Sequence, residues 1–184
     1  MTLITAGLFI DALGISSGSV LTGNILAVVS RIRFISHGLL IPLLLPISAD
    51  AVGFNKRWTK AVLVLTVILM IAGLAEAAVT VLEPDTAAGV TRFKAAASTP
   101  VWASAVSRVL SFGTVIPLMI AGITVWIKQK TPLLFLSGFF MFAFSALGPA
   151  TGNTDLIFYI SMFGEVVLVM FLYLYALTKK ETDA

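Results

Sequence analysis

The sequence contains no cysteine and a single histidine, His37. Without cysteine, the chain cannot form disulfides, carry out thiolate chemistry, or hold iron–sulfur clusters or cysteine-ligated zinc. A single histidine also excludes a bis-histidine haem and any metal site built from several histidines. No metal site is therefore predicted, and the sequence identifies no cofactor.

Charge is scarce as well, since only 11% of the 184 residues are charged while 59% are hydrophobic. An average soluble domain is about 25% charged, and a soluble fold of this size could not bury so much apolar surface. The mean hydropathy of +1.04 agrees. The net charge of +3 is too small and too dispersed to indicate a nucleic-acid partner. We therefore expect an integral membrane protein whose main partner is the lipid bilayer.

Long apolar runs, by contrast, are abundant. A helix that crosses a bilayer needs about 20 mostly apolar residues. We predict an all-α polytopic membrane helix bundle, a single domain spanning residues 1–184, with about six transmembrane helices. The glycines of the first run could divide it into two pieces. The predicted spans are residues 3–29, 34–52, 61–82, 106–127, 133–147 and 156–177.

The longest connection between these runs, residues 83–105, has a polar start and then two basic residues, Arg92 and Lys94. It fits either an interfacial helix on the membrane surface or a plain extramembrane loop. With six spans, the segments on the side of the termini hold seven lysines and arginines and the other side holds five. The positive-inside rule then predicts that both termini are cytoplasmic and that residues 83–105 are external.

Two segments share the pattern R-x-x-S-x-G-x-x-I-P-L, at Arg33–Leu43 and at Arg108–Leu118. They indicate either a parallel internal repeat or a chance match in a biased membrane composition. In both cases the pattern predicts an arginine at the outer interface and small residues for close helix packing. The proline that follows can kink the helix.

Charged groups within the spans are candidate binding residues, because each costs about 2.5 kcal/mol or more at the centre of a bilayer unless it is compensated. His37 and Glu76 are expected at similar depth on adjacent helices, and Arg33 shares a helix face with His37. Arg108 is expected at the same outer level. This cluster of Arg33, His37, Glu76 and Arg108 could bind an anionic group, relay protons, or form a structural ion pair.

Two further acids lie deeper in the predicted bundle. Glu165 is placed near the midplane of the last span, with no charged neighbour in its own helix. It could be a proton or cation site, or a protonated group that hydrogen-bonds a neighbouring helix. Asp11 is placed in the inner half of the first span, among small residues that suit close packing or a hydrated path.

No G-x-S-x-G, H-E-x-x-H or Walker A motif is present. Three hypotheses remain open. The first is a small transporter or channel for an ion or small solute, including a proton-coupled one, and the second is a non-catalytic subunit or a lipid- or pigment-binding scaffold of a larger membrane complex. The third is an intramembrane lipid-modifying enzyme with His37 and Glu76 as its acid–base pair. Self-association is also compatible with the small-residue faces. The candidate ligand- or ion-binding residues are Glu165, Glu76, His37, Asp11, Arg33 and Arg108.

Overall fold

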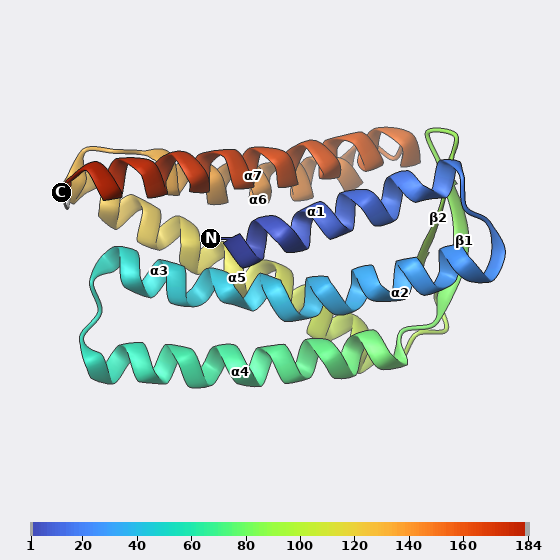
Figure 1. The fold of residues 1–184 in the computed structure, drawn as a ribbon, viewed down its shortest axis with the longest axis horizontal. Helices are drawn as coiled ribbons and strands as arrows, with labels where there is room; N and C mark the ends of the chain where they lie inside the picture. The colour runs from blue at the N-terminus through green and yellow to red at the C-terminus, as the bar shows by residue number, and fades with distance from the viewer. Residues whose placement is uncertain (1, 183–184) are drawn as a thin grey trace.

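A computed structural model describes residues 2–182 and consists of apolar helices and one β-hairpin (Figure 1). The rod formed by α2 (Gly23–Leu40) and α3 (Leu44–Val52) is continuous, with a short 3-10 turn at residues 41–43. The elements in chain order are α1 (Thr2–Ser16) with the 3-10 turn η1 (Ser17–Ser19), α2 (Gly23–Leu40), η2 (Ile41–Leu43), α3 (Leu44–Val52), α4 (Lys56–Val79), β1 (Leu82–Ala87), β2 (Val90–Ala95), α5 (Val101–Gln129), α6 (Leu133–Ala150) and α7 (Thr154–Thr182).

Four of these rods are long and apolar enough to cross a membrane: residues 23–52, 56–79, 101–129 and 155–179. The apolar stretches in α1 and α6, residues 3–19 and 133–147, are shorter. Large apolar side chains such as Ile71 on α4, which is 62% exposed, cover the outside of the bundle. An apolar exterior is what a lipid solvent requires. The protein is an all-α membrane bundle, as predicted, while the membrane-spanning character of α1 and α6 stays a prediction.

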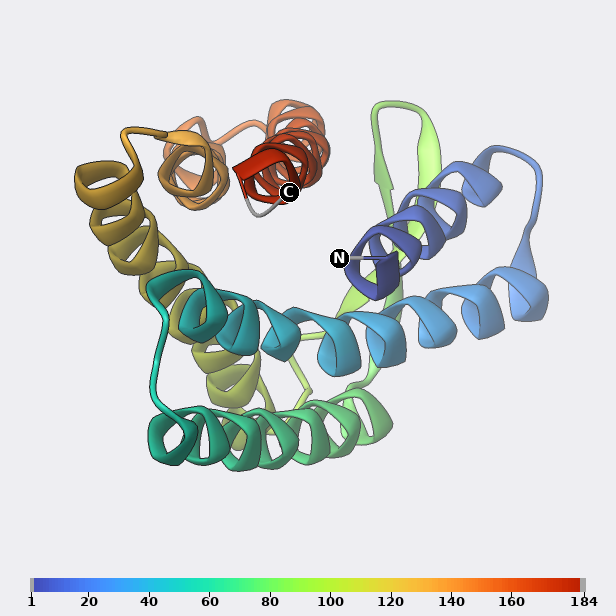
Figure 2. The ribbon, with the colours of Figure 1, turned by 60° about the vertical axis from the view of Figure 1, so that its left-hand side comes forward.

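The long rods α2–α3, α4, α5 and α7 run between two ends of the bundle, whereas α1 begins partway along it (Figures 1 and 2). We call one end the hairpin end, because it carries β1 and β2 together with the turns at residues 20–22 and 151–153. The opposite end, here the tail end, carries the turns at residues 53–55 and 130–132 and the C-terminal turn of α7.

The first predicted span, residues 3–29, is wrong as a single helix. α1 and η1 end at Ser19, Thr22 is extended, and Gly23 has a φ of +61°, a conformation that glycine adopts readily. Residues 24–29 therefore belong to α2. As a consequence, Arg31 and Arg33 lie within α2 rather than between two spans.

Residues 83–105 contain a hairpin and the start of α5, so the interfacial helix is not formed. β1 and β2 are antiparallel, with Glu83 opposite Lys94 and Asp85 opposite Arg92. Cross-strand pairs of opposite charge stabilise such a ladder. Ala88 and Gly89 at the turn both have positive φ, 53° and 75°, as in the tight turns that match strand twist.

The hairpin lies across the end of the bundle and is attached to two helices. The backbone N–H of Ala88 donates to Asp155 Oδ1 of α7 at 2.6 Å. On the other side, a Cβ on Gly18 would lie 1.7 Å from the carbonyl oxygen of Thr91, so only glycine allows η1 to meet β2 this closely. The hairpin is therefore part of the bundle rather than a free loop.

α2 and α4 touch at backbone level through Gly38 and Gly73. A Cβ on Gly73 would lie 2.5 Å from the carbonyl oxygen of Gly38, and a Cβ on Gly38 would lie 2.8 Å from the carbonyl group of Gly73. Close packing through small residues, as predicted for Gly38, is therefore present.

The two similar sequence segments lie in different surroundings. Gly113 occupies the place of Gly38 in the second segment, but it is exposed, and the nearest atom to its Cβ would be its own helix neighbour Val109, at 3.7 Å. Pro42 belongs to the turn between α2 and α3, whereas Pro117 lies inside the continuous α5. The shared pattern thus does not produce a shared environment.

The main apolar core occupies the half of the bundle toward the tail end. Its centre is formed by fully buried leucines of α3, α5, α6 and α7, with exposed fractions between 0% and 2%. They are Leu44, Leu118, Leu134, Leu168 and Leu172. Trp58 and Trp102 lie in the first turns of α4 and α5, and Trp126 in the last turn of α5, positions that are typical of interfacial rings.

Candidate functional site

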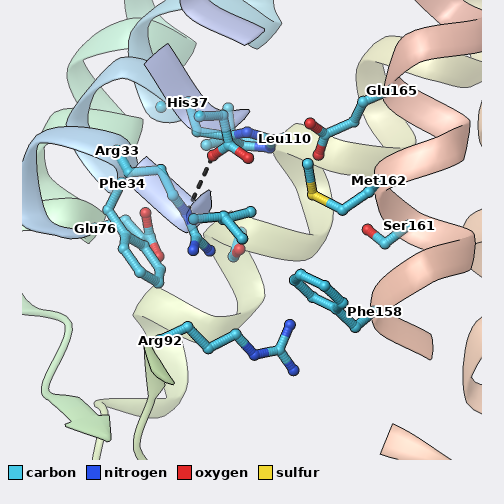
Figure 3. Close-up of a pocket in the computed structure, with 14 residues that line it drawn as sticks. Arg33, Phe34, His37, Glu76, Arg92, Leu110, Phe158, Ser161, Met162 and Glu165 are labelled. Carbon is cyan, nitrogen blue, oxygen red and sulfur yellow. Dashed lines mark ion pairs between the residues drawn. The ribbon is translucent and has the colours of Figure 1, made fainter. Parts of the chain in front are cut away.

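A polar cavity of about 240 Å³ lies in the half of the bundle toward the hairpin end (Figure 3). It is enclosed by α1, α2, α4, β2, α5 and α7, and it contains five of the six predicted candidate residues. Its lining residues are Asp11, Ile15, Arg33, Phe34, His37, Gly38, Glu76, Arg92, Ser107, Leu110, Phe158, Ser161, Met162 and Glu165.

An ion pair between α1 and α2 forms one wall of this cavity. Arg33 Nε lies 3.1 Å from Asp11 Oδ1, and the side chains are 20% and 8% exposed. The guanidinium of Arg33 also lies over the ring of Phe34, at 5.2 Å. Because α1 and η1 end at Ser19, Asp11 lies closer to the hairpin end than the inner-half position predicted for it. Pairing with Arg33 compensates a charge that would otherwise be costly at this depth.

Glu165 of α7 faces this ion pair across the cavity (Figure 3). Its carboxyl group is close enough to that of Asp11 for the two to share a hydrogen bond. Such a bond requires a proton on one of the two carboxyl groups, because two ionised carboxylates can only accept. Glu165 lies ~16 Å along α7 from its first residue, Thr154, at 1.5 Å per residue, and its midplane depth stays a prediction. Asp11 and Glu165 thus form a carboxyl pair that can bind or release a proton.

Glu76 enters the cavity from α4 and is 6% exposed. The Thr80 hydroxyl lies 3.1 Å from Glu76 Oε1 and 2.8 Å from the Glu76 carbonyl oxygen. Arg31 donates to the carbonyl oxygens of Ala77 and Thr80, the latter at 2.8 Å, and its charge also acts on Glu76. Arg31 therefore compensates both the free carbonyls at the end of α4 and a buried carboxylate.

His37 lies between the polar cavity and a smaller hollow of about 50 Å³ on its tail-end side. The charges of Asp11 and Arg33 act on its imidazole ring. Among the described residues, no hydrogen bond joins His37 to Glu76, and none joins it to Ser107 or Ser161. His37 and Glu76 therefore line the same cavity without a hydrogen bond between them, and their role as an acid–base pair stays a prediction.

Arg92 and Phe158 complete the site from the hairpin and from α7, and sequence reasoning missed both. The guanidinium of Arg92 lies 5.1 Å from the centre of the Phe158 ring, and its Nη2 lies 3.1 Å from Asp85 Oδ2. Partial burial raises the pKa of Asp85, but the hydrogen bonds and charges of Arg92 and Lys94 outweigh it, so the pKa lies below its ordinary value. The alternating charges of residues 83–94 are the signal that could have revealed these pairs.

Arg108 lies outside the site, contrary to the predicted cluster. Its side chain is exposed, and its Nε donates to the Ser104 carbonyl oxygen at 3.2 Å. The residues of α5 that line the cavity are Ser107 and Leu110. Adjacent residues differ by about 100° around a helix, so Arg108 points away when Ser107 points inward.

The cavity is closed toward the tail end and bordered by lipid-facing surface on one side. Beyond His37 and Glu165, the next turns bring Leu44 and Leu168 into the dry core, at 0% and 1% exposure. An apolar groove of about 360 Å³ lies between α1 and α7, and it shares Met162 and Glu165 with the polar cavity. The site is therefore a one-sided cavity rather than a continuous pore.

The chain matches no family model, no curated protein and no solved structure.

Proposed function

We propose that the protein is a small membrane transporter that couples movement of an ion or small solute to proton binding at the Asp11–Glu165 carboxyl pair. The observation that carries this proposal is the juxtaposition of two carboxyl groups, those of Asp11 and Glu165, in the lining of a polar cavity. Ionisable residues at membrane depth are characteristic of proton and ion pathways. A channel is less well supported, because Leu44 and Leu168 close the path toward the tail end.

The proposed orientation places both termini in the cytoplasm and the mouth of the cavity outside. The tail end carries seven lysines and arginines, which lie in or beside its two turns and in the C-terminal part of α7. At the hairpin end, only Arg92 and Lys94 lie in a connecting segment, since Arg31 and Arg33 belong to α2. The positive-inside rule therefore favours a cytoplasmic tail end more strongly than the sequence count alone. In this proposal α1 and α6 also span the bilayer, giving six spans.

The test is proton movement in liposomes that carry the purified protein and a trapped pH-sensitive dye. A membrane potential is imposed with potassium and valinomycin, and sodium, potassium, choline or tetraethylammonium is supplied outside. We expect proton flux that depends on at least one of these solutes and that falls at least tenfold in Glu165→Gln. Glu83→Gln is the matched control, since Glu83 lies on the hairpin with a side chain that is 43% exposed. Equal flux in the wild type and Glu165→Gln, or no flux above empty liposomes, would overturn the proposal.

The groove between α1 and α7 also supports a second candidate, a lipid-binding subunit of a larger complex. Native mass spectrometry from mild detergent separates the two. A lipid of defined mass retained on every copy of the chain would favour the subunit, whereas an empty chain would favour the transporter.

A further inference from the structure

Two hollows of opposite character meet at Glu165. The cavity on its hairpin-end side contains charged groups from several elements, whereas the groove on its other side is lined almost entirely by apolar side chains of α1 and α7, such as Leu8, Ala12 and Val169. Glu165 and Met162 belong to both. A molecule with a polar head and an apolar body would fill both hollows, with its head beside the Glu165 carboxyl group.

The groove opens toward the lipid. Phe9 of α1 is 63% exposed, and Val166 and Met170 of α7 are 62% and 46% exposed. These side chains lie on the outer surface of a bundle whose exterior is apolar. A ligand that partitions into the bilayer can therefore reach Glu165 sideways between the two helices, without first passing through water.

The charges around Glu165 decide the sign of the ligand head. The groups that face this region are Asp11 from α1, Arg33 and His37 from α2, Glu76 from α4, and Arg92 from β2. Arg33 is paired with Asp11 at 3.1 Å. Arg92 is paired with Asp85, also at 3.1 Å.

Glu76 and Glu165 differ in the positive charge that lies beside each of them. Glu76 has the charge of Arg31 beside it and a hydrogen bond from Thr80. Each of the other acids has an arginine beside it, whereas Glu165 has no cation of its own among the residues that the structure describes. His37 adds positive charge only when it is protonated. The site thus holds one more acid than permanent cations, so it favours a proton or a single positive charge and disfavours an anion.

We propose that the ligand is an amphipathic monovalent cation, with an ammonium-type head at Glu165 and an apolar body in the groove between α1 and α7. When the head binds, the proton shared by Asp11 and Glu165 leaves to the water of the cavity, so one positive charge replaces another. This inference rests on the proposed function, because it names the substrate class of the same carboxyl pair.

The experiment measures binding by isothermal titration in mild detergent, with protein-free micelles as the blank. The probes are tetramethylammonium, butyltrimethylammonium and hexyltrimethylammonium, with hexanesulfonate as an anion of similar length. Each methylene group that enters the groove is expected to raise the affinity about fourfold. Hexanesulfonate is expected to show no binding above the blank. Glu165→Gln is expected to weaken hexyltrimethylammonium binding at least tenfold.

Ala12→Phe and Val169→Phe, two separate variants, fill the groove from α1 and from α7. Each is expected to abolish the gain with chain length and to leave tetramethylammonium binding unchanged. Leu174→Phe, on α7 outside the groove and 39% exposed, is the matched control and is expected to keep the gain.

An affinity that does not rise with chain length in the wild type would overturn the amphipathic ligand, as would equal binding of hexanesulfonate. Proton flux that is sensitive to Glu165→Gln would then still support a transporter for a different solute. Conversely, chain-length-dependent binding without any flux would overturn the transporter and leave the ligand class in place.

Discussion

The backbone contact between Gly38 and Gly73 predicts a large and specific cost for a single methyl group. In Gly73→Ala the new Cβ would lie 2.5 Å from the Gly38 carbonyl oxygen and 2.8 Å from its carbonyl carbon and Cα. These are backbone atoms, so no side chain can rotate away, and α2 and α4 must move apart. Overpacking of this kind costs about 1–3 kcal/mol. Alanine in place of glycine in a helix returns about 0.5–1 kcal/mol. We therefore expect a net destabilisation of up to about 2.5 kcal/mol.

The matched control is Gly113→Ala on α5, where the nearest atom to the new Cβ is Val109 Cγ1 at 3.7 Å, an ordinary contact. This variant gains the helix preference without the clash, so it is expected to be neutral or more stable by up to about 1 kcal/mol. The assay is reversible unfolding in mixed micelles with increasing dodecyl sulfate, followed by far-ultraviolet circular dichroism. Equal free-energy changes in the two variants would refute the close approach of α2 and α4. Gly73 lies three residues before Glu76, so Gly73→Ala is also expected to reduce proton flux through displacement of that carboxyl group.

Two further predictions concern the charged residues of the site and the hairpin. Arg33→Gln leaves Asp11 without its ion-pair partner and is expected to lower the free energy of unfolding by up to about 3–5 kcal/mol in the same assay. Arg108→Gln, the control, is expected to stay within about 0.5 kcal/mol of the wild type. Equal losses of stability in the two variants would contradict the pairing of Arg33 with Asp11. Because the folded-state pKa of Asp85 is lowered, its stabilising effect is present above its unfolded pKa of about 3.9 and is lost as the pH falls through the folded value. Asp85→Asn is therefore expected to lower the melting temperature at pH 6, and its difference from the wild type is expected to shrink as the pH falls below the unfolded pKa of Asp85. A difference independent of pH would refute the ion-pair explanation.

Hydrophobicity predicts the bundle well, because lipid-facing surface requires apolar residues wherever a helix meets the bilayer. Residues 101–129 and 155–179 cover the predicted spans 106–127 and 156–177, and residues 56–79 overlap the predicted span 61–82 except at its last three residues. The first span failed for a local reason. Its break depends on the extended Thr22 and the positive φ of Gly23, and apolar content does not report backbone conformation. Placing the break at residues 30–33 instead of residues 20–22 assigned Arg31 and Arg33 to a loop, whereas both belong to α2.

The acidic residues of the candidate site could be predicted from the sequence, but their contacts could not. Asp11, Glu76 and Glu165 stand out in the sequence because each interrupts an apolar run. Which of them meet could not be predicted, since the Asp11–Glu165 contact joins α1 to α7, elements from opposite ends of the chain. Residue depth alone could not place Arg108 either, because its exclusion from the cavity depends on its angle around α5. The hairpin escaped prediction because its strands are short and carry charge, so that neither hydropathy nor an apolar alternation marks them.

The separation of the bundle into a polar half and a dry half limits how the proposed transporter could work. A cation held at Glu165 must pass the level of Leu44 and Leu168, which are almost fully buried, so some helix has to move. α1 is the best placed, because it is shorter than the rods of four other spans and faces α7 across a groove rather than a packed interface. Its main polar attachment in this region is the Asp11–Arg33 pair. A proton or cation that changes the charge on the Asp11–Glu165 pair alters the strength of that attachment directly. Binding and helix movement would then be coupled through one ion pair, without any separate gate.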